Sequence, residues 1–169
     1  MKIKTCALVA AIAASLSLPA MAAEKPYTQT RSLSAGVAMK AVTAAVDKCA
    51  ADGYQVAAAL VDRSGVMLAF SRQPLAGSHT VDVAITKAKT SASFKTSTME
   101  MMNNPRLKQL NYADGVLLIG GGLPINPGGH FYGGIGVSGA PGEKMSGDVD
   151  QVCAQSGIDA IVEVLEFAE

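Results

Sequence analysis

The chain has only two histidines, His79 and His130, and they are its first candidates for chemistry. A neutral imidazole ligates haem iron or another metal, and it also serves as a general acid or base near neutral pH. His79 follows a Gly-Ser pair at the start of a predicted helix, and His130 follows the loop sequence Asn-Pro-Gly-Gly. Both positions lie beside loops, where binding residues concentrate. For either histidine, a solvated or hydrogen-bonded side chain without a ligand is the alternative.

Ten of the 17 glycines fall between Gly120 and Gly142. Such a run indicates either tight turns between strands or a surface on which a ligand lies against bare backbone. Within it, Gly134-Ile-Gly136-Val-Ser-Gly139 matches GxGxxG, but Ala140-Pro-Gly142 follows, so no helix begins there to receive a pyrophosphate. The pattern therefore does not favour a dinucleotide site.

Three methionines, Met99, Met101 and Met102, could hold a soft metal or contact haem iron. Their spacing points them in different directions on a helix, which favours core packing. No HExxH motif or paired Cys/His spacing indicates zinc.

Residues 1–22 have the pattern of a secretory signal peptide: Lys2 and Lys4, an apolar run, and the cleavage sequence Ala20-Met21-Ala22. The apolar run is too short to span a membrane, so we expect a periplasmic or secreted protein that has no membrane anchor once the signal is removed. Cys49 and Cys153 then remain, and an oxidising compartment suggests one disulfide between them. Two separate buried thiols are the alternative.

The mature chain of 147 residues fits one domain, 23–169, and carries 12 basic against 14 acidic residues. This balance argues against non-specific nucleic-acid binding, which needs a basic surface.

Hydrophobic periodicity predicts helices over 32–52, 79–94, a short segment after Ser97, and 149–167. Strands are predicted over 56–61, 66–70, 116–119 and 130–137. Ser97 with Glu100, and Asp148 with Gln151, are expected to cap the third and last helices. The second helix has Lys87, Lys89 and Thr90 on its polar side. Strands joined by hairpins imply an antiparallel sheet with helices packed on it, an α+β domain.

In order along 31–167, several short motifs resemble those of the GlcG/HbpS-like family. They are Val61-Asp62 with Gly65, Lys87-Ala88 with Thr90 and Phe94, Gly121-Gly122-Leu123-Pro124, Gly133 to Gly139, and Asp150 with Cys153-Ala154.

The resemblance implies profilin-like α/β/α layers with a five-stranded antiparallel sheet, and a tendency to form homo-oligomers. It also implies haem as a cofactor, because some members bind haem and the family is sometimes labelled haem-degrading. The axial ligand is a threonine in one type of member and a histidine in another, which makes Thr96 and Thr98 candidates beside the two histidines. The acidic iron-binding clusters of some secreted members have no clear counterpart here.

The leading hypothesis is an exported haem-binding protein that carries or senses haem or protects against it. His79 is the first candidate ligand to the iron and His130 the second. The expected propionate partners are Arg72, Lys87 and Lys95, and the expected backbone wall beside the ligand is formed by Gly121, Gly122, Gly134 and Gly136.

Two alternatives remain open. One is a small-molecule enzyme or accessory subunit that acts on an organic acid or another cofactor at the glycine-rich loops, with His130 as acid or base. The other is a non-catalytic scaffold whose glycines serve only tight turns. A homo-oligomer is expected in addition, because Ile125, Phe131 and Ile135 would otherwise leave apolar surface exposed.

Export should remove Met1 to Ala22, because Ala20 and Ala22 meet the small-residue requirement of signal peptidase on either side of Met21. Intact mass of the protein recovered from a periplasmic extract measures this. A mass that retains the leader would instead indicate an anchored protein.

Overall fold

The computed structural model describes residues 25–167, so the predicted signal peptide lies outside the described residues. The helices are α1 (Ala35–Ala51), α2 (His79–Phe94), α3 (Thr98–Asn103), α4 (Asp148–Glu166) and the short 3-10 helices η1 (Pro105–Tyr112) and η2 (Pro127–Gly129). The strands are β1 (Ala57–Asp62), β2 (Met67–Arg72), β3 (Gly122–Ile125) and β4 (Gly133–Ser138).

The four strands form one antiparallel sheet in the order β2-β1-β4-β3. The described residues therefore contain four strands where the family resemblance implied five. The predicted strand 116–119 is also wrong, because these residues bond to helix side chains instead of to another strand. The Leu117 amide donates to the Thr90 hydroxyl, and the Ile119 carbonyl accepts from Thr98.

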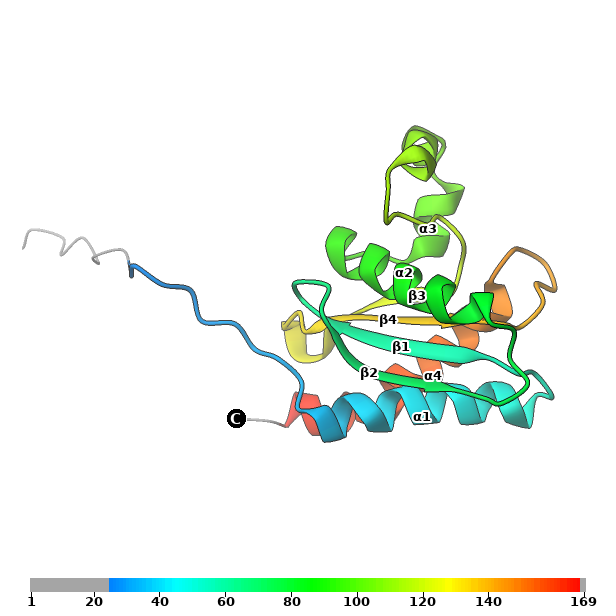
Figure 1. Ribbon diagram of the computed structural model, residues 1–169. Coiled ribbons are helices and arrows are strands. Elements are labelled where there is room, and N and C mark those ends of the chain that lie inside the picture. The colour runs from blue at the N-terminus through cyan, green and yellow to red at the C-terminus, as the bar shows by residue number, and fades with distance from the viewer. Residues whose placement is uncertain (1–24, 168–169) are drawn as a thin grey trace, which may run out of the picture.

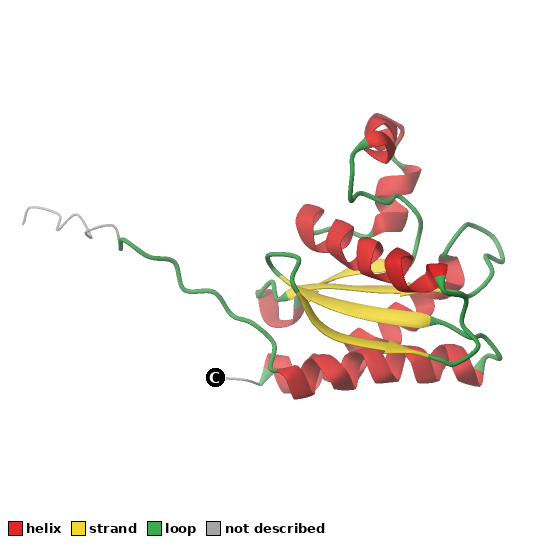
Figure 2. Ribbon diagram, viewed as in Figure 1, coloured by secondary structure: helices red, strands yellow, loops and turns green. Residues whose placement is uncertain are grey.

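The helices lie on both faces of the sheet (Figures 1 and 2). α1 and α4 lie side by side on one face and enclose the larger apolar core, which includes Val42, Leu60, Ile135 and Ile161. α2 covers the other face through a smaller core of mostly alanine side chains. α3 and η1 extend beyond α2, and the extended segment 25–34 leaves the domain at the start of α1 (Figure 1). The α+β class with layered helices is therefore present.

Glycines in β4 set the distance between α2 and the sheet. A Cβ on Gly134 would lie 2.5 Å from the Ala88 carbonyl oxygen, and a Cβ on Gly136 would lie 2.5 Å from the Ala88 amide nitrogen. Both glycines are buried under the helix. The backbone wall that we expected to face a flat ligand is thus covered by the chain's own α2.

The expected exposed apolar surface is also largely absent, because Ile125 and Ile135 are fully buried. Phe131 is half-buried. In an α/β/α sandwich, helices cover both faces of the sheet, so apolar strand residues are buried whichever face they point to.

Of the two predicted helix N-caps, Ser97 is confirmed and Asp148 is not. Ser97 caps α3, where its hydroxyl accepts from the Met99 amide. Asp148 is instead the first residue of α4, after Gly147 in the left-handed conformation.

The Asp148 carboxylate accepts hydrogen bonds from loop amides that precede α4. The amides of Lys144 and Glu143, followed by those of Met145 and Val149, lower the pKa of Asp148 to about 2. Because the folded-state pKa is depressed, the contribution of this carboxylate to stability is present above pH 4 and is lost as the pH falls toward 2.

Cys49 of α1 and Cys153 of α4 form a disulfide in the structure, with 5.6 Å between their Cα atoms. Both residues are fully buried between the helices and the sheet. The bond links the two helices through cysteines that are 104 residues apart in the sequence.

Reduction of this disulfide should lower the free energy of unfolding by up to about 4–5 kcal/mol, because the bond closes a loop of about 100 residues in the unfolded chain. Urea denaturation of oxidised and reduced protein measures the difference. The double variant Cys49→Ala/Cys153→Ala is the control, and its stability should not respond to reductant. Equal unfolding midpoints for oxidised and reduced wild-type protein would contradict this prediction.

Candidate ligand-binding site

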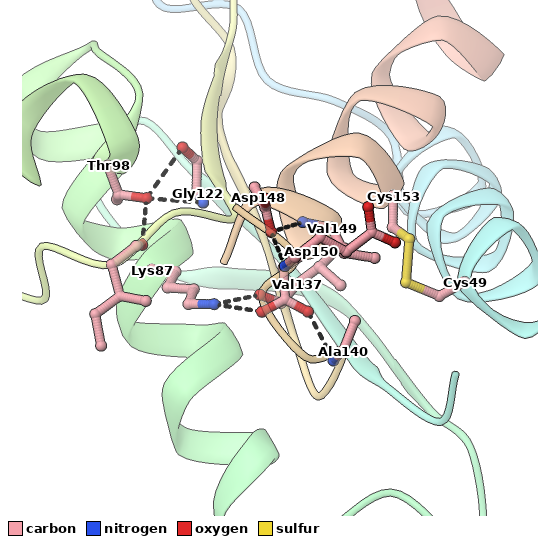
Figure 3. Close-up of polar contacts among 12 residues, drawn as sticks. Cys49, Lys87, Thr98, Gly122, Val137, Ala140, Asp148, Val149, Asp150 and Cys153 are labelled. Atoms are coloured by element: carbon pink, nitrogen blue, oxygen red, sulfur yellow. Dashed lines mark hydrogen bonds and ion pairs between the residues drawn. A yellow bond between two sulfur atoms is a disulfide. The ribbon is translucent and has the colours of Figure 1, made fainter. Parts of the chain in front are cut away.

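A buried polar junction lies where α2, the end of β4 and the start of α4 meet (Figure 3). The Lys87 ammonium nitrogen lies 2.7 Å from a carboxylate oxygen of Asp150 and 2.9 Å from the Val137 carbonyl oxygen. The other Asp150 oxygen accepts from the Ala140 amide at 2.9 Å. Gly121 makes room for the pair, because a Cβ there would lie 2.9 Å from the Lys87 nitrogen.

This junction is structural. Burial lowers the pKa of Lys87, and the Asp150 carboxylate opposes that shift by favouring the charged ammonium. The Lys87 residue is only 1 % exposed, so its charge is used inside the fold and is not offered to a ligand's propionates. The predicted polar side of α2 comprised Lys87, Lys89 and Thr90. Only Lys89 is exposed, because Lys87 and Thr90 are both buried.

Thr98 belongs to the same junction (Figure 3). Its hydroxyl donates to the Ile119 carbonyl at 2.7 Å and accepts from the Gly122 amide at 2.9 Å. A Cβ on Gly122 would lie 2.6 Å from the Thr98 methyl carbon, so both residues are packed together. Thr98 and Gly122 therefore hold β3 to α3, and neither faces a cleft as we had expected.

A second cluster lies at the C-terminal end of α2 and is built around the Phe131 ring. The guanidinium carbon of Arg63 lies 5.6 Å from the ring centroid, and the Lys95 nitrogen lies 5.4 Å from it. The Arg63 guanidinium also donates to the Phe131 carbonyl at 3.4 Å. Cations within about 6 Å of an aromatic face are held there by the ring quadrupole.

Three separate elements bring this cluster together. Arg63 lies in the turn between β1 and β2, Lys95 ends α2, and Phe131 precedes β4. The antiparallel pairing of Asp62 with Gly133 places the turn beside the start of β4. These positions are far apart in sequence, so only the sheet topology makes them neighbours.

His130 extends this cluster into a cleft of about 660 Å³. The cleft is lined by Gln29, Thr30, Arg31, Arg63, His130 and Phe131. Its volume lies within the range of about 300–1,000 Å³ typical of small-molecule and cofactor sites. His130, Arg63 and Arg31 are exposed, so the cleft offers an imidazole, two guanidinium groups and an aromatic ring to solvent.

The charges of this cleft are not balanced within the described chain. The ion pairs among residues 25–167 are Lys48–Asp52 and Lys87–Asp150, so the two arginines of the cleft have no carboxylate within 4 Å there. The same holds for Lys95, which contacts the Phe131 ring from beside the cleft and lines a separate pocket with Glu100. The nearby Asp62 carboxylate accepts from the amides of Ser64 and Val66 in the hairpin turn. The arrangement therefore suits a flat, anionic ligand that an imidazole can ligate.

The remaining expected residues lie elsewhere. His79 is exposed at the first turn of α2, about 24 Å along the helix from Lys95 at 1.5 Å per residue. Arg72 is also exposed, and its guanidinium donates to the Ala76 and Pro74 carbonyls after β2. Thr96 is half-buried beside Lys95, and its hydroxyl donates to Glu100 at 2.6 Å.

Sequence reasoning missed Arg31, Arg63 and Phe131 as site residues. Phe131 adjoins His130, and Arg63 occupies the turn of a predicted hairpin, so local sequence places both beside loops. No spacing rule connects them to Lys95, because their proximity depends on strand pairing.

A histidine buried in a small pocket would favour an acid–base enzyme, because burial shifts its pKa. Both His79 and His130 are exposed. Residues 25–167 contain no group of three or more His, Cys, Asp or Glu side chains arranged to hold a metal ion. Within that same range, no helix is long and apolar enough to cross a membrane.

Comparison with known proteins identifies the relatives of this chain. The family model described as "Haem degrading protein HbpS-like" matches residues 33–159. No curated protein sequence matches the chain significantly.

Solved structures give closer comparisons. A double mutant of HbpS from Streptomyces reticuli has 35% sequence identity and a TM-score of 0.75, with 86% of this chain and 97% of that chain covered. The Klebsiella pneumoniae protein ORFY has 25% identity and a TM-score of 0.72, with coverage of 82% and 97%. A PduOC:Heme complex has 28% identity and a TM-score of 0.68, with coverage of 78% and 96%.

The Lys87–Asp150 pair should contribute far more to stability than a surface pair. Replacement Lys87→Met is expected to lower the free energy of unfolding by about 3–5 kcal/mol, because it leaves a buried carboxylate without its cation. Lys48→Met is the matched control, since it removes an exposed pair with Asp52 and should cost less than about 1 kcal/mol.

Urea denaturation of both variants measures these differences. The double variant Lys87→Met/Asp150→Asn should lose less stability than the sum of its two single variants, because no unpaired charge is left behind. A Lys87→Met variant as stable as Lys48→Met would show that the buried pair has no special role.

Proposed function

The chain belongs to the HbpS-like family, and we propose that it binds haem in the cleft beside His130 and Phe131. The family description names haem degradation, and one structural relative was solved as a haem complex. These names describe the relatives, and they support haem as the ligand to test here.

The single observation that carries this proposal is the set of unpaired cations around Phe131. Haem combines a flat apolar macrocycle with two carboxylates, and its iron accepts an imidazole ligand. The cleft pairs the Phe131 ring with Arg31 and Arg63, which have no carboxylate partner in residues 25–167, and it adds the exposed imidazole of His130. Lys95 contacts the same ring from beside the cleft. The donor set therefore fits the chemistry of this cofactor.

Each side chain has a distinct part in the proposal. The His130 imidazole would hold the iron, and Arg63 and Lys95 would pair with the propionates. The Phe131 ring holds both cations in place. When bound, haem supplies a redox-active iron, and its reactivity is set by the axial ligand and by the polarity of the surrounding pocket.

This assignment reverses the order that we expected from sequence. His79 and Arg72 lie away from the cluster, whereas His130 lies next to Phe131. Thr96 remains a secondary candidate, because it adjoins Lys95.

Export and assembly are further parts of the proposal. We propose that the mature protein acts outside the cytoplasm, as a haem carrier, sensor or protective binder, on the basis of the signal-peptide pattern in residues 1–22. A homo-oligomer is also proposed. Val66 and Met67 expose apolar side chains at the edge strand β2, and light scattering tests that part directly.

Titration of the purified mature protein with haemin, followed by visible absorption, tests haem binding. The wild-type protein should show a saturable Soret change, and His130→Ala should weaken haemin binding by up to about tenfold, or 1.4 kcal/mol, because it removes the iron ligand. His79→Ala is the matched control, since it removes an equally exposed imidazole at the other end of α2, and it should keep the wild-type spectrum.

Absence of a saturable Soret change in the wild type would overturn the proposal. If His79→Ala changes the spectrum and His130→Ala does not, His79 is the iron ligand, as expected from the sequence. Wild-type spectra for both variants would leave Thr96 as the next ligand to test.

A further inference from the structure

The cleft around Phe131 holds more groups that address a ligand's carboxylates than groups that address its metal. We propose that this site recognises the anionic porphyrin itself, so that metal-free porphyrins with carboxylate side chains bind about as well as haem. This inference rests on the proposed function and names the ligand class of the same site.

The first support is the charge balance. Arg63 and Lys95 lie within 5.6 Å and 5.4 Å of one ring centroid, and neither has a carboxylate within 4 Å in residues 25–167. Arg31 lines the same cleft. Arg31 and Arg63 therefore give the cleft two guanidinium groups of like charge, and an anionic ligand offsets their repulsion. A dicarboxylate therefore gains from the site whether or not it carries a metal.

The second support is the backbone of Lys95. It is the one non-glycine residue with positive φ among the described residues, at φ 53° and ψ 35° at the end of α2. Glycine is the usual residue at this position of a helix end, because other residues lose about 1 kcal/mol or more in the left-handed conformation. A lysine here costs stability and places an ammonium over Phe131. Strain of this kind points to a role for the side chain in binding.

The third support is the weak positioning of the metal ligand. Histidines that bind metals strongly usually donate their second ring nitrogen to a fixed partner, which orients the imidazole. The His130 side chain is exposed and has no such hydrogen bond to any of residues 25–167. By contrast, the Arg63 guanidinium is anchored by the Phe131 carbonyl. The Arg63 cation is thus better positioned than the imidazole before the ligand arrives.

Three porphyrins separate charge recognition from metal recognition. Haemin carries iron and two carboxylates, protoporphyrin IX has the same carboxylates without a metal, and tetrakis(N-methylpyridinium)porphyrin has the macrocycle with four positive charges. Absorption and fluorescence titrations of the mature protein give a dissociation constant for each. We expect haemin and protoporphyrin IX to bind within about tenfold of one another. The cationic porphyrin should show no saturable binding.

Variants then assign the contacts. Lys95→Gly and Arg63→Gln should each weaken both anionic porphyrins by about tenfold, whereas His130→Ala should weaken haemin alone. Lys144→Gln removes an exposed cation from the loop before α4 and should change neither affinity. Because glycine suits the backbone of residue 95, the thermal unfolding midpoint of Lys95→Gly should stay at or above the wild-type value. A loss of binding without a loss of stability is therefore specific to a binding role.

The outcomes distinguish this inference from the proposed function. Haemin binding without protoporphyrin IX binding would overturn the inference and leave haem binding intact. Equal binding of the cationic porphyrin, or unchanged affinities in Lys95→Gly and Arg63→Gln, would also overturn it, because charge would not then decide recognition. Binding of none of the three porphyrins would overturn both proposals.

Discussion

The close approach of α2 to the glycine-bearing face of β4 is the constraint on which the rest of the structure depends. Gly134 and Gly136 leave no side chain between helix and strand, so the backbone of Ala88 lies almost directly on the sheet. A helix this close leaves no space for a ligand on that face. It also brings Lys87 within reach of Asp150, so the packing of backbone against backbone decides where the buried charge can go.

The same helix then carries two lysines with opposite roles. Lys87 is buried, paired with Asp150 and surrounded by carbonyl and carboxylate oxygens, so it fixes the junction between α2, β4 and α4. Lys95 lies at the helix end, exposed and without a carboxylate in the described chain, where its charge remains available. The two lysines differ in whether they have a carboxylate partner. An ammonium that is already neutralised inside the fold attracts no further anion. The unpaired cations consequently lie with Phe131 and His130, at the end of the sheet opposite the buried pair.

Much of the architecture could be predicted from local sequence. The predicted helix 79–94 has the bounds of α2, and the predicted hairpin corresponds to β1 and β2, because both depend on hydrophobic periodicity and a short glycine turn. The strand predicted over 116–119 is wrong because its apolar residues resemble a strand although no partner lies beside them. The Gly-Gly-Leu-Pro segment that follows forms β3 instead, where it pairs with β4. Strand pairing is a long-range property, and the short β3 carries no periodicity of its own.

The candidate site was far less predictable than the fold. By itself, the sequence determined the α+β class, the order of the helices, the two cysteines available for a disulfide and the position of both histidines beside loops, because residue type and spacing fix these locally. Only the tertiary structure decided that Lys87 and Thr98 are structural, that the glycines receive a helix, and that Arg63, Lys95 and Phe131 meet beside His130. The physical reason is that a side chain's role depends on whether its charge or hydrogen-bonding capacity is already satisfied. That depends on residues brought close by strand pairing and helix packing, at separations for which the sequence carries no spacing rule.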